Sequence, residues 1–141
     1  MTRYVSEALR GFVAARAGYR CEYCLIREED TFFGCEVDHI VAVKHGGLAQ
    51  QENLANACLV CNRNKGSDLG SVSAPSGQFT RFFNPRIDRW RDYFQLDRLV
   101  IKALTDIGDV TVRIFRFNDD ERLLERQALV AAGTYPGPPV T

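Results

Sequence analysis

Two short segments of the chain bring together side chains that could do chemistry. In the first, Asp38 directly precedes His39, one of only two histidines among the 141 residues. In the second, Asn62 and Lys65 follow a cysteine pair within the run CLVCNRNK at residues 58–65. Imidazole titrates near neutral pH and can serve as a general base, and carboxylate and amide oxygens suit hard divalent cations. These residue types therefore indicate metal-assisted hydrolysis.

Hydrolysis of a phosphodiester bond would use all of these groups. A base must activate water, and a cation must stabilise the charge that develops on the phosphate and on the leaving oxygen. His39 is the candidate base, and Asp38 and Asn62 are the candidate ligands of Mg²⁺ or Mn²⁺. Asn53 is expected to hydrogen-bond to the His39 ring and hold its useful tautomer. Two further cations follow Asn62 and are placed to meet phosphate oxygens: Arg63 and Lys65.

One geometric condition applies to Asp38 and His39. Residues 32–41 read as a strand, and in a regular strand adjacent side chains point to opposite faces. Both can serve one site only if the strand ends or bends there, and a Gly-Gly turn signal follows at residues 46–47. We interpret His45, the other histidine, as a loop residue rather than a ligand.

Four of the five cysteines form two CxxC pairs, Cys21 with Cys24 and Cys58 with Cys61. Two thiolates at this spacing bind a metal ion from one side, and a tetrahedral Zn²⁺ site needs two such pairs. The sequence therefore predicts a structural zinc site made by all four. A redox dithiol is the competing interpretation, but no βαβ pattern surrounds either pair. Cys35 is left over and is expected to be a buried apolar residue.

Composition is that of an ordinary globular protein, with 45% hydrophobic and 26% charged residues. No apolar run approaches the roughly 18–20 residues that span a bilayer, and the N-terminus has no apolar signal core. We therefore expect a cytoplasmic protein without membrane association. The 18 cations and 18 anions cancel, but residues 21–59 carry two cations and seven anions, whereas residues 60–102 carry eight and four. An acidic block beside a basic one fits a metal site next to a phosphate-binding face.

The first half of the chain predicts a helix, two strands and a second helix. Residues 6–17 read as a helix capped by Ser6, because apolar residues recur on one face. Residues 54–58 read as a second short strand, and residues 59–69 as a short helix that begins at the second CxxC pair. Residues 70–80 read as a flexible loop by composition.

The second half predicts an aromatic-rich segment, a hairpin and a last helix. Residues 81–94 interleave aromatic residues with arginines; we interpret the aromatics as core and Arg81 and Arg86 as phosphate contacts. Two β-rich runs, 98–104 and 109–117, are expected to pair as a hairpin. A final helix is expected with Asn118 as its cap and Gly133 as its terminator, before a tail with three prolines: Pro136, Pro138 and Pro139.

At these residues the sequence resembles the HNH endonuclease family, which has the ββα-metal fold. The motifs that carry the resemblance occur in the family's order: Cys21-x-x-Cys24, Asp38-His39-Ile40, Gly46-Gly47, Asn53-Leu54 and Cys58-x-x-Cys61-Asn62-x-x-Lys65. They cover residues 8–68, and the segment from Phe83 to Pro136 is similar to the tail of a group of small bacterial HNH proteins. The resemblance implies an α+β fold in one domain, residues 1–141. This domain would contain a ββα-metal core with a zinc knuckle at 18–69 and a β-hairpin and helix extension at 81–135.

The resemblance also implies metal-dependent cleavage or nicking of DNA. The position of His39 is then the general base, the positions of Asp38 and Asn62 hold a catalytic cation, and the position of Asn53 orients the base. That cation would be Mg²⁺ or another divalent ion such as Mn²⁺ or Ni²⁺, and the four-cysteine branch also carries structural zinc. The expected products are a 5′-phosphate and a 3′-hydroxyl.

The chain departs from the family pattern at two positions. The last motif position is Asn62 rather than His, which weakens the donor set without removing it, and Ala42 replaces a frequent Pro. Two other functions stay open: a non-catalytic zinc-dependent nucleic-acid-binding module, and a protein-interaction domain whose zinc is purely structural. A bare zinc module would not need the four polar residues that set the first hypothesis apart: Asp38, His39, Asn53 and Asn62.

Overall fold

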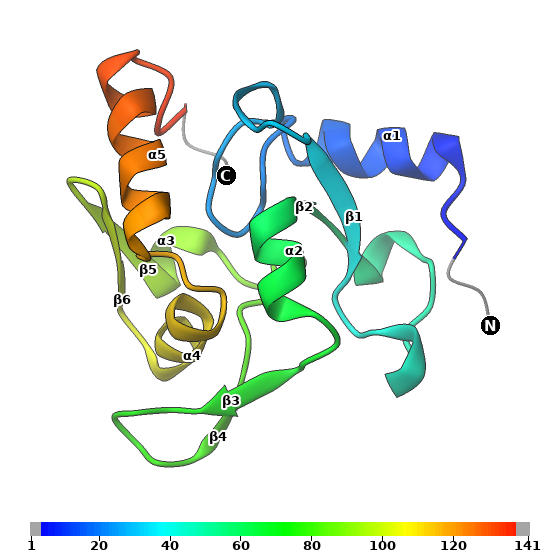
Figure 1. Cartoon of the computed structure of the whole chain (residues 1–141). Helices are drawn as coiled ribbons and strands as arrows, with labels where there is room; N and C mark the ends of the chain where they lie inside the picture. The colour runs from blue at the N-terminus through cyan, green and yellow to red at the C-terminus, as the bar shows by residue number, and fades with distance from the viewer. Residues whose placement is uncertain (1–3, 138–141) are drawn as a thin grey trace.

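Two antiparallel strands and a short helix form the centre of the structure, a computed structural model that describes residues 4–137 (Figure 1). Strand β1 (Cys35–His39) pairs with β2 (Leu54–Cys58), with Cys35 opposite Cys58 and His39 opposite Leu54. Helix α2 (Leu59–Lys65) follows β2 without a linker. The expected strand, strand and helix are therefore present, and the fold is the α+β ββα arrangement that the sequence predicts.

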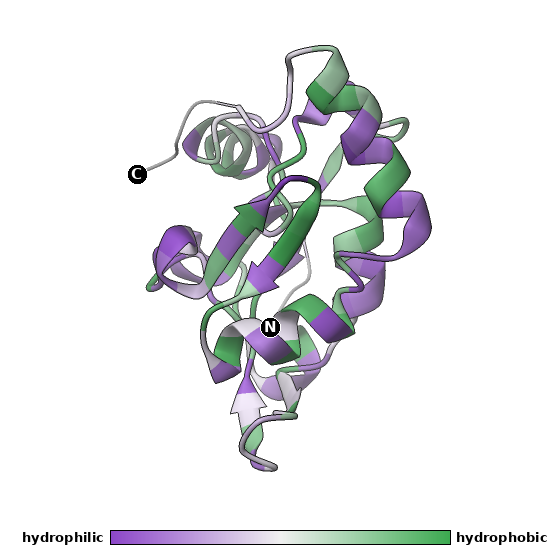
Figure 2. Ribbon diagram, turned by 90° about the vertical axis from the view of Figure 1, so that its left-hand side faces the viewer, coloured by the Kyte–Doolittle hydropathy of each residue, from purple (hydrophilic) through white to green (hydrophobic). Residues whose placement is uncertain are grey.

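Helix α1 (Glu7–Arg16) lies against β2, where Arg16 donates hydrogen bonds to the backbone carbonyls of Gln51 and Leu54. The Ser6 side chain accepts a hydrogen bond from the Leu9 backbone, so the predicted cap is confirmed. Only one residue within this helix, Val13, is fully buried. Figure 2 shows hydrophobic and hydrophilic residues mixed along the helices, as expected for elements that bury one side.

Residues 70–80 are not the flexible loop that their composition predicts. Strands β3 (Gly70–Val72) and β4 (Phe79–Arg81) form a short antiparallel hairpin. A Cβ on Gly70 would lie 2.2 Å from the Thr80 carbonyl oxygen, so the close approach of the two strands requires glycine there. The Gly/Ser-rich composition extends into β3, which begins with Gly70 and Ser71, and so does not mark a flexible loop.

The predicted hairpin is displaced along the chain, and residues 109–117 are not a strand. After a short helix α3 (Trp90–Tyr93), the pairing strands are β5 (Phe94–Asp97) and β6 (Val100–Ala103), and α4 (Asp106–Ile114) follows. The Thr105 side chain caps α4 by accepting from the Gly108 backbone. Four residues at helical spacing face inward: Ile107, Val110, Thr111 and Ile114. The helical period with a cap therefore outweighs the apparent alternation of β-branched residues.

Helix α5 (Asp120–Ala131) begins one residue later than predicted. Its N-cap residue is Asp119, while the Asn118 side chain bonds to the backbone N–H and C=O of Ile101. The expected end is confirmed, because Gly133 has a φ of 78° directly after the C-cap residue. In Figure 1, α5 stands beside the β5–β6 hairpin. Pro138 and Pro139 of the predicted tail lie outside the described residues.

One aromatic cluster joins the two halves of the chain. Phe115 packs against Tyr23 of the first CxxC loop, with ring centroids 4.9 Å apart, and against Phe82 at 5.1 Å. Phe83 and Phe94 are also buried in this cluster, and Trp90 is partly buried. The interpretation of these aromatics as core is therefore confirmed. No helix among the described residues is long and apolar enough to cross a membrane.

Replacing Phe115 by Ala is expected to destabilise the protein by about 3–5 kcal/mol, because a fully buried ring leaves a cavity between the two halves. Phe79→Ala is the matched control: its ring is 70% exposed, and we expect a change within about 0.5 kcal/mol. Denaturant unfolding of the zinc-loaded proteins measures both. Equal losses for the two variants would contradict the assignment of Phe115 to the core.

Candidate active site and metal centre

The four CxxC cysteines converge on one buried point. Their sulfur atoms all lie within 4.8 Å of one another, and Cys24 Sγ is 3.7 Å from Cys58 Sγ. Four sulfurs around Zn²⁺, with Zn–S bonds of about 2.3 Å, lie roughly 3.8 Å apart in a tetrahedron. All four cysteines are buried, and none forms a disulfide. The donor set and its spacing therefore fit the predicted metal centre.

A cation from α5 lies against this centre. The guanidinium of Arg122 donates to Cys24 Sγ at 3.0 Å and lies 3.7 Å from Cys58 Sγ and 3.8 Å from Cys61 Sγ. Burial alone would raise the pKa of Cys24, but hydrogen bonds with the other cysteines and the charge of Arg122 leave it well below its ordinary value. Arg122 therefore favours the thiolate state that a metal needs.

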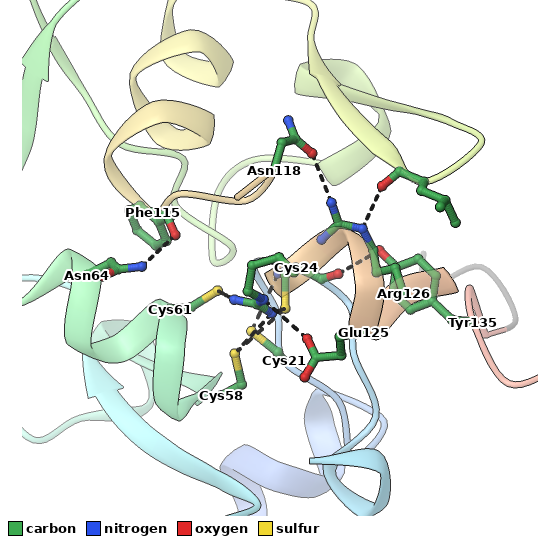
Figure 3. A network of polar contacts seen from close by, with 12 residues as sticks. Cys21, Cys24, Cys58, Cys61, Asn64, Phe115, Asn118, Glu125, Arg126 and Tyr135 are labelled. Atoms are coloured by element: carbon green, nitrogen blue, oxygen red, sulfur yellow. Dashed lines mark hydrogen bonds and ion pairs between the residues drawn. The ribbon is translucent and has the colours of Figure 1, made fainter. Parts of the chain in front are cut away.

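The same region ties the C-terminal segment to the CxxC loop, as Figure 3 shows. The Tyr135 hydroxyl donates to the Cys24 carbonyl at 2.8 Å, and Arg126 donates to the Leu99 carbonyl at 2.7 Å and to Asn118 Oδ1 at 2.9 Å. The segment after α5 is thus bonded to a metal-binding loop 111 residues earlier in the chain. Cys35, predicted to be buried, is only partly buried and lies outside the cluster.

Asp38, His39 and Asn62 line one open pocket of about 330 Å³. Strand β1 ends at His39, which meets the condition that the strand must end or bend there. Asp38 and His39 therefore both line the pocket, although they are adjacent in the chain. Asn62, which also lines the pocket, comes from α2. The structure therefore brings together the three residues that sequence reasoning assigned to the base and the cation. His45 is an exposed loop residue, as interpreted.

Asp38 is buried, and both of its carboxylate oxygens are hydrogen-bonded. Oδ2 accepts from the Tyr23 hydroxyl at 2.7 Å, and Oδ1 accepts from Lys65 Nζ at 3.2 Å. Burial raises the pKa of Asp38, while the Lys65 ammonium and the Tyr23 hydroxyl act in the opposite direction. A carboxylate offers about four lone-pair sites, so each oxygen keeps one for a cation.

Asn62 is oriented by a second carboxylate. Its Nδ2 donates to Glu36 Oε2 at 2.9 Å, which leaves its carbonyl oxygen available to a cation. Glu36 precedes Asp38 by two residues on β1, on the same face of the strand. Asp38 and Asn62 therefore fit a hard divalent ion, with one anionic and one neutral oxygen ligand.

Asn53 bonds to the loop that follows His39, although it was expected to bond to the imidazole. Its amide donates to the carbonyls of Val41 and Leu48 at 2.9 and 3.0 Å, and its Oδ1 accepts from the Val41 N–H at 2.8 Å. A Cβ on Gly47 would lie 1.6 Å from the Val41 carbonyl oxygen, so only glycine fits inside this loop. Asn53 thus positions His39 through the backbone that follows it.

Three of the four cations predicted to contact phosphate are bonded to carboxylates of the protein instead. Lys65 is only 2% exposed and is committed to Asp38 and to the His39 carbonyl. Arg81 is bonded to Asp88, and Arg86 is bonded to Glu22 and to the Leu54 carbonyl. Arg63 is exposed, but it lines other cavities than the one with His39.

The His39 pocket is also lined by two exposed cations that sequence reasoning did not place there. They are Arg10 of α1 and Lys44 of the loop after His39. Tyr23, Glu36 and Lys65 were likewise not assigned to the surroundings of Asp38 and Asn62. A signal existed for Lys65, because residues three apart on a helix share a face, and Asn62 and Lys65 are three apart. No signal in the sequence relates Arg10 to the pocket.

Replacing Arg122 by Met should weaken zinc binding by about tenfold or more, because the thiolates lose their charge-assisted hydrogen bonds. Competition with a chromophoric chelator measures the affinity. Arg116→Met is the matched control, since Arg116 is exposed and pairs only with Asp119. If both variants hold zinc as the wild type does, Arg122 does not support the metal centre.

Asn53→Ala removes three hydrogen bonds from the loop at residues 41–48 and is expected to loosen it. Amide hydrogen exchange should rise at Val41, whose N–H loses its acceptor, while zinc content stays unchanged. Gln50→Ala is the control, because Gln50 is exposed and lies between this loop and Asn53 in the chain. Unchanged protection at Val41 in Asn53→Ala would show that the loop does not depend on this side chain.

Comparison with known families agrees with the motifs and the geometry. Residues 21–68 match the family described as HNH endonuclease, a range that contains both CxxC pairs as well as Asp38, His39 and Asn62 of the pocket. No curated protein and no solved structure is significantly similar to the chain. Helix α1 and everything from β3 onward lie outside the matched range. Residues 21–68 therefore form an HNH endonuclease domain, and the four cysteines within it are positioned to bind a metal ion.

Proposed function

We propose that the protein is a metal-dependent DNA endonuclease of the HNH type that cleaves or nicks DNA in the cytoplasm. One observation carries the proposal: Asp38, His39 and Asn62 line the same open pocket within the HNH domain. The pocket is open to the surface, and two exposed cations, Arg10 and Lys44, line it.

In this proposal His39 takes the proton from the attacking water, and its position is fixed by the loop that Asn53 ties down. Asp38 and Asn62 hold a divalent cation such as Mg²⁺, Mn²⁺ or Ni²⁺. When bound, such an ion polarises a non-bridging phosphate oxygen and stabilises the charge on the leaving 3′ oxygen. Glu36 and Tyr23 keep the two ligands in their rotamers. The expected products are a 5′-phosphate and a 3′-hydroxyl.

Among the cations predicted from the sequence, Arg63 best keeps a role in DNA contact, because it is exposed and has no ion pair among the described residues. Arg81 keeps 43% of its side chain exposed beside Asp88 and can reach a phosphate at the protein surface. Lys65 and Arg86 act inside the protein, where their ion pairs hold Asp38 and Glu22.

A non-catalytic zinc-dependent nucleic-acid-binding module is the second candidate. The four-cysteine centre and the basic residues serve either function. The arrangement around Asp38 and Asn62 favours the enzyme, because a binding module has no use for an oriented carboxylate and amide beside a histidine in an open pocket.

Conversion of supercoiled plasmid to nicked or linear DNA tests the proposal. We expect cleavage that requires added Mg²⁺, Mn²⁺ or Ni²⁺, stops in EDTA and falls by about 10²–10⁴-fold in His39→Ala, which loses the general base. His45→Ala is the matched control, because it removes the chain's other histidine from an exposed loop. Zinc content and folding are checked in each variant.

Two results would count against the enzyme. DNA binding without conversion under any of the three ions would favour the non-catalytic module. Cleavage that leaves 3′-phosphate ends would exclude the mechanism with His39 as base for water.

A further inference from the structure

A second cavity, of about 170 Å³, lies beside the edge of β2 that faces away from β1. At this edge Arg16 and Arg86, which both line the cavity, donate to the Leu54 carbonyl at 2.6 and 2.9 Å. Four arginines from two segments of the chain line the cavity, which we call the arginine pocket: Arg16, Arg20, Arg86 and Arg89. Among the described residues, none lines both this cavity and the His39 pocket. The protein therefore has a cationic cavity separate from the candidate active site.

Two carboxylates also line the arginine pocket, and each is bonded to an arginine. Asp88 accepts two hydrogen bonds from Arg81, at 2.7 and 3.0 Å. Glu22 forms an ion pair with Arg86. Counting Arg81, which does not line the cavity itself, five cations stand against two anions. The pocket therefore keeps an excess of positive charge after its own ion pairs are formed.

Two of the four arginines, Arg16 and Arg89, form no ion pair among residues 4–137. Arg16 is held in place by hydrogen bonds to two backbone carbonyls, which do not neutralise its charge. Arg89 is exposed, whereas Arg20 is only 7% exposed. An anion that enters the pocket would therefore meet cations both at the surface of the protein and inside it.

The residue types that line this cavity favour phosphate over other anions. A guanidinium group is planar, stays charged and donates in a fork that matches two phosphate oxygens. Phosphate carries more negative charge than a single carboxylate, and the pocket has more than one cation to offset. An apolar part of the lining, formed by Phe83, Pro85 and Trp90, offers a surface for the sugar or base of a nucleotide.

We propose that the arginine pocket is a second phosphate-binding site of this protein, separate from the His39 pocket. The phosphate belongs either to the backbone of DNA or to a free nucleotide, which share this chemistry. Helix α1 contributes Arg10 to the His39 pocket and Arg16 to the arginine pocket, about 9 Å apart along its axis. We therefore expect the DNA backbone. That source rests on the proposed function, whereas the phosphate site itself does not.

Phosphate binding can be measured at this pocket directly, because Trp90 is the only tryptophan of the chain and lines it. The zinc-loaded full chain is titrated with inorganic phosphate and with thymidine monophosphate, with chloride keeping the ionic strength constant. Calorimetry gives the affinity, and the emission of Trp90 reports the place. We expect saturable binding that Arg89→Gln weakens about tenfold, because one charge-assisted hydrogen bond is lost.

Arg91→Gln is the matched control for this variant. Arg91 is exposed on α3, two residues after Arg89, and does not line the arginine pocket. Both substitutions remove one surface charge from the same segment, so a difference between them reports the pocket. Zinc content and unfolding are compared for both variants.

A duplex oligonucleotide distinguishes the two sources of phosphate. The chain carries His39→Ala, so that bound DNA is not cut, and the DNA dissociation constant is measured over a range of salt concentrations. If a backbone phosphate occupies the pocket, Arg89→Gln lowers the slope of log affinity against log salt by about one, while Arg91→Gln does not. An unchanged slope with retained binding of thymidine monophosphate supports the site and assigns it to a free nucleotide.

The outcomes separate this inference from the proposed function. If neither phosphate nor thymidine monophosphate binds and the salt slope for DNA is the same in both variants, the inference is overturned and the endonuclease stays in place. Equal weakening by Arg89→Gln and Arg91→Gln also overturns it, because the loss then reflects surface charge in general. Phosphate binding by a protein that neither binds nor cleaves DNA overturns the proposed function and leaves the phosphate site.

Discussion

The geometry of the four-cysteine centre is the constraint on which the rest of the structure depends. Cys58 ends β2 and caps α2, so a metal held by both CxxC pairs fixes the loop at 21–24 against the junction of strand and helix. Backbone bonds follow the same alignment, because Glu22 N–H donates to the Asn56 carbonyl at 2.8 Å. Tyr23, between the first two cysteines, is thereby brought to the hydrogen bond with Asp38. Tyr23 thus connects the metal centre to the pocket.

Two buried cations give these two sites opposite characters. Four thiolates and Zn²⁺ leave a net negative centre, and Arg122 offsets part of that charge without competing for the metal. In the pocket, Lys65 offsets the charge of the buried Asp38 carboxylate. The first arrangement suits an ion that stays for the life of the fold. In the pocket, by contrast, the ion pair with Lys65 holds the Asp38 carboxylate in place.

The sequence allowed the central elements and the metal centre to be predicted, because each rests on local chemistry. CxxC spacing, the Ser6 cap and the glycine after the last helix act within a few residues. The errors occurred where tertiary packing decides. Residues 109–117 satisfy both a strand period and a helical one, and the core that receives Val110 and Thr111 selects the helix. Asn118 is a suitable residue type for a helix cap, but its side chain hydrogen-bonds to the backbone of Ile101 instead.

The same distinction explains the candidate site. Residue types led to the prediction of Asp38, His39 and Asn62 as base and cation ligands, because few side chains can supply these groups, and the structure places all three along one pocket. The roles of Asn53 and Lys65 depend on where their side chains lie, and the structure directs them to the loop backbone and to Asp38. Lys65 lies one helical turn after Asn62, so the helix face that presents Asn62 to the pocket also brings the Lys65 ammonium to Asp38. Position on α2, rather than the charge of the residue, thus makes Lys65 part of the site, whereas its neighbour Arg63 faces solvent.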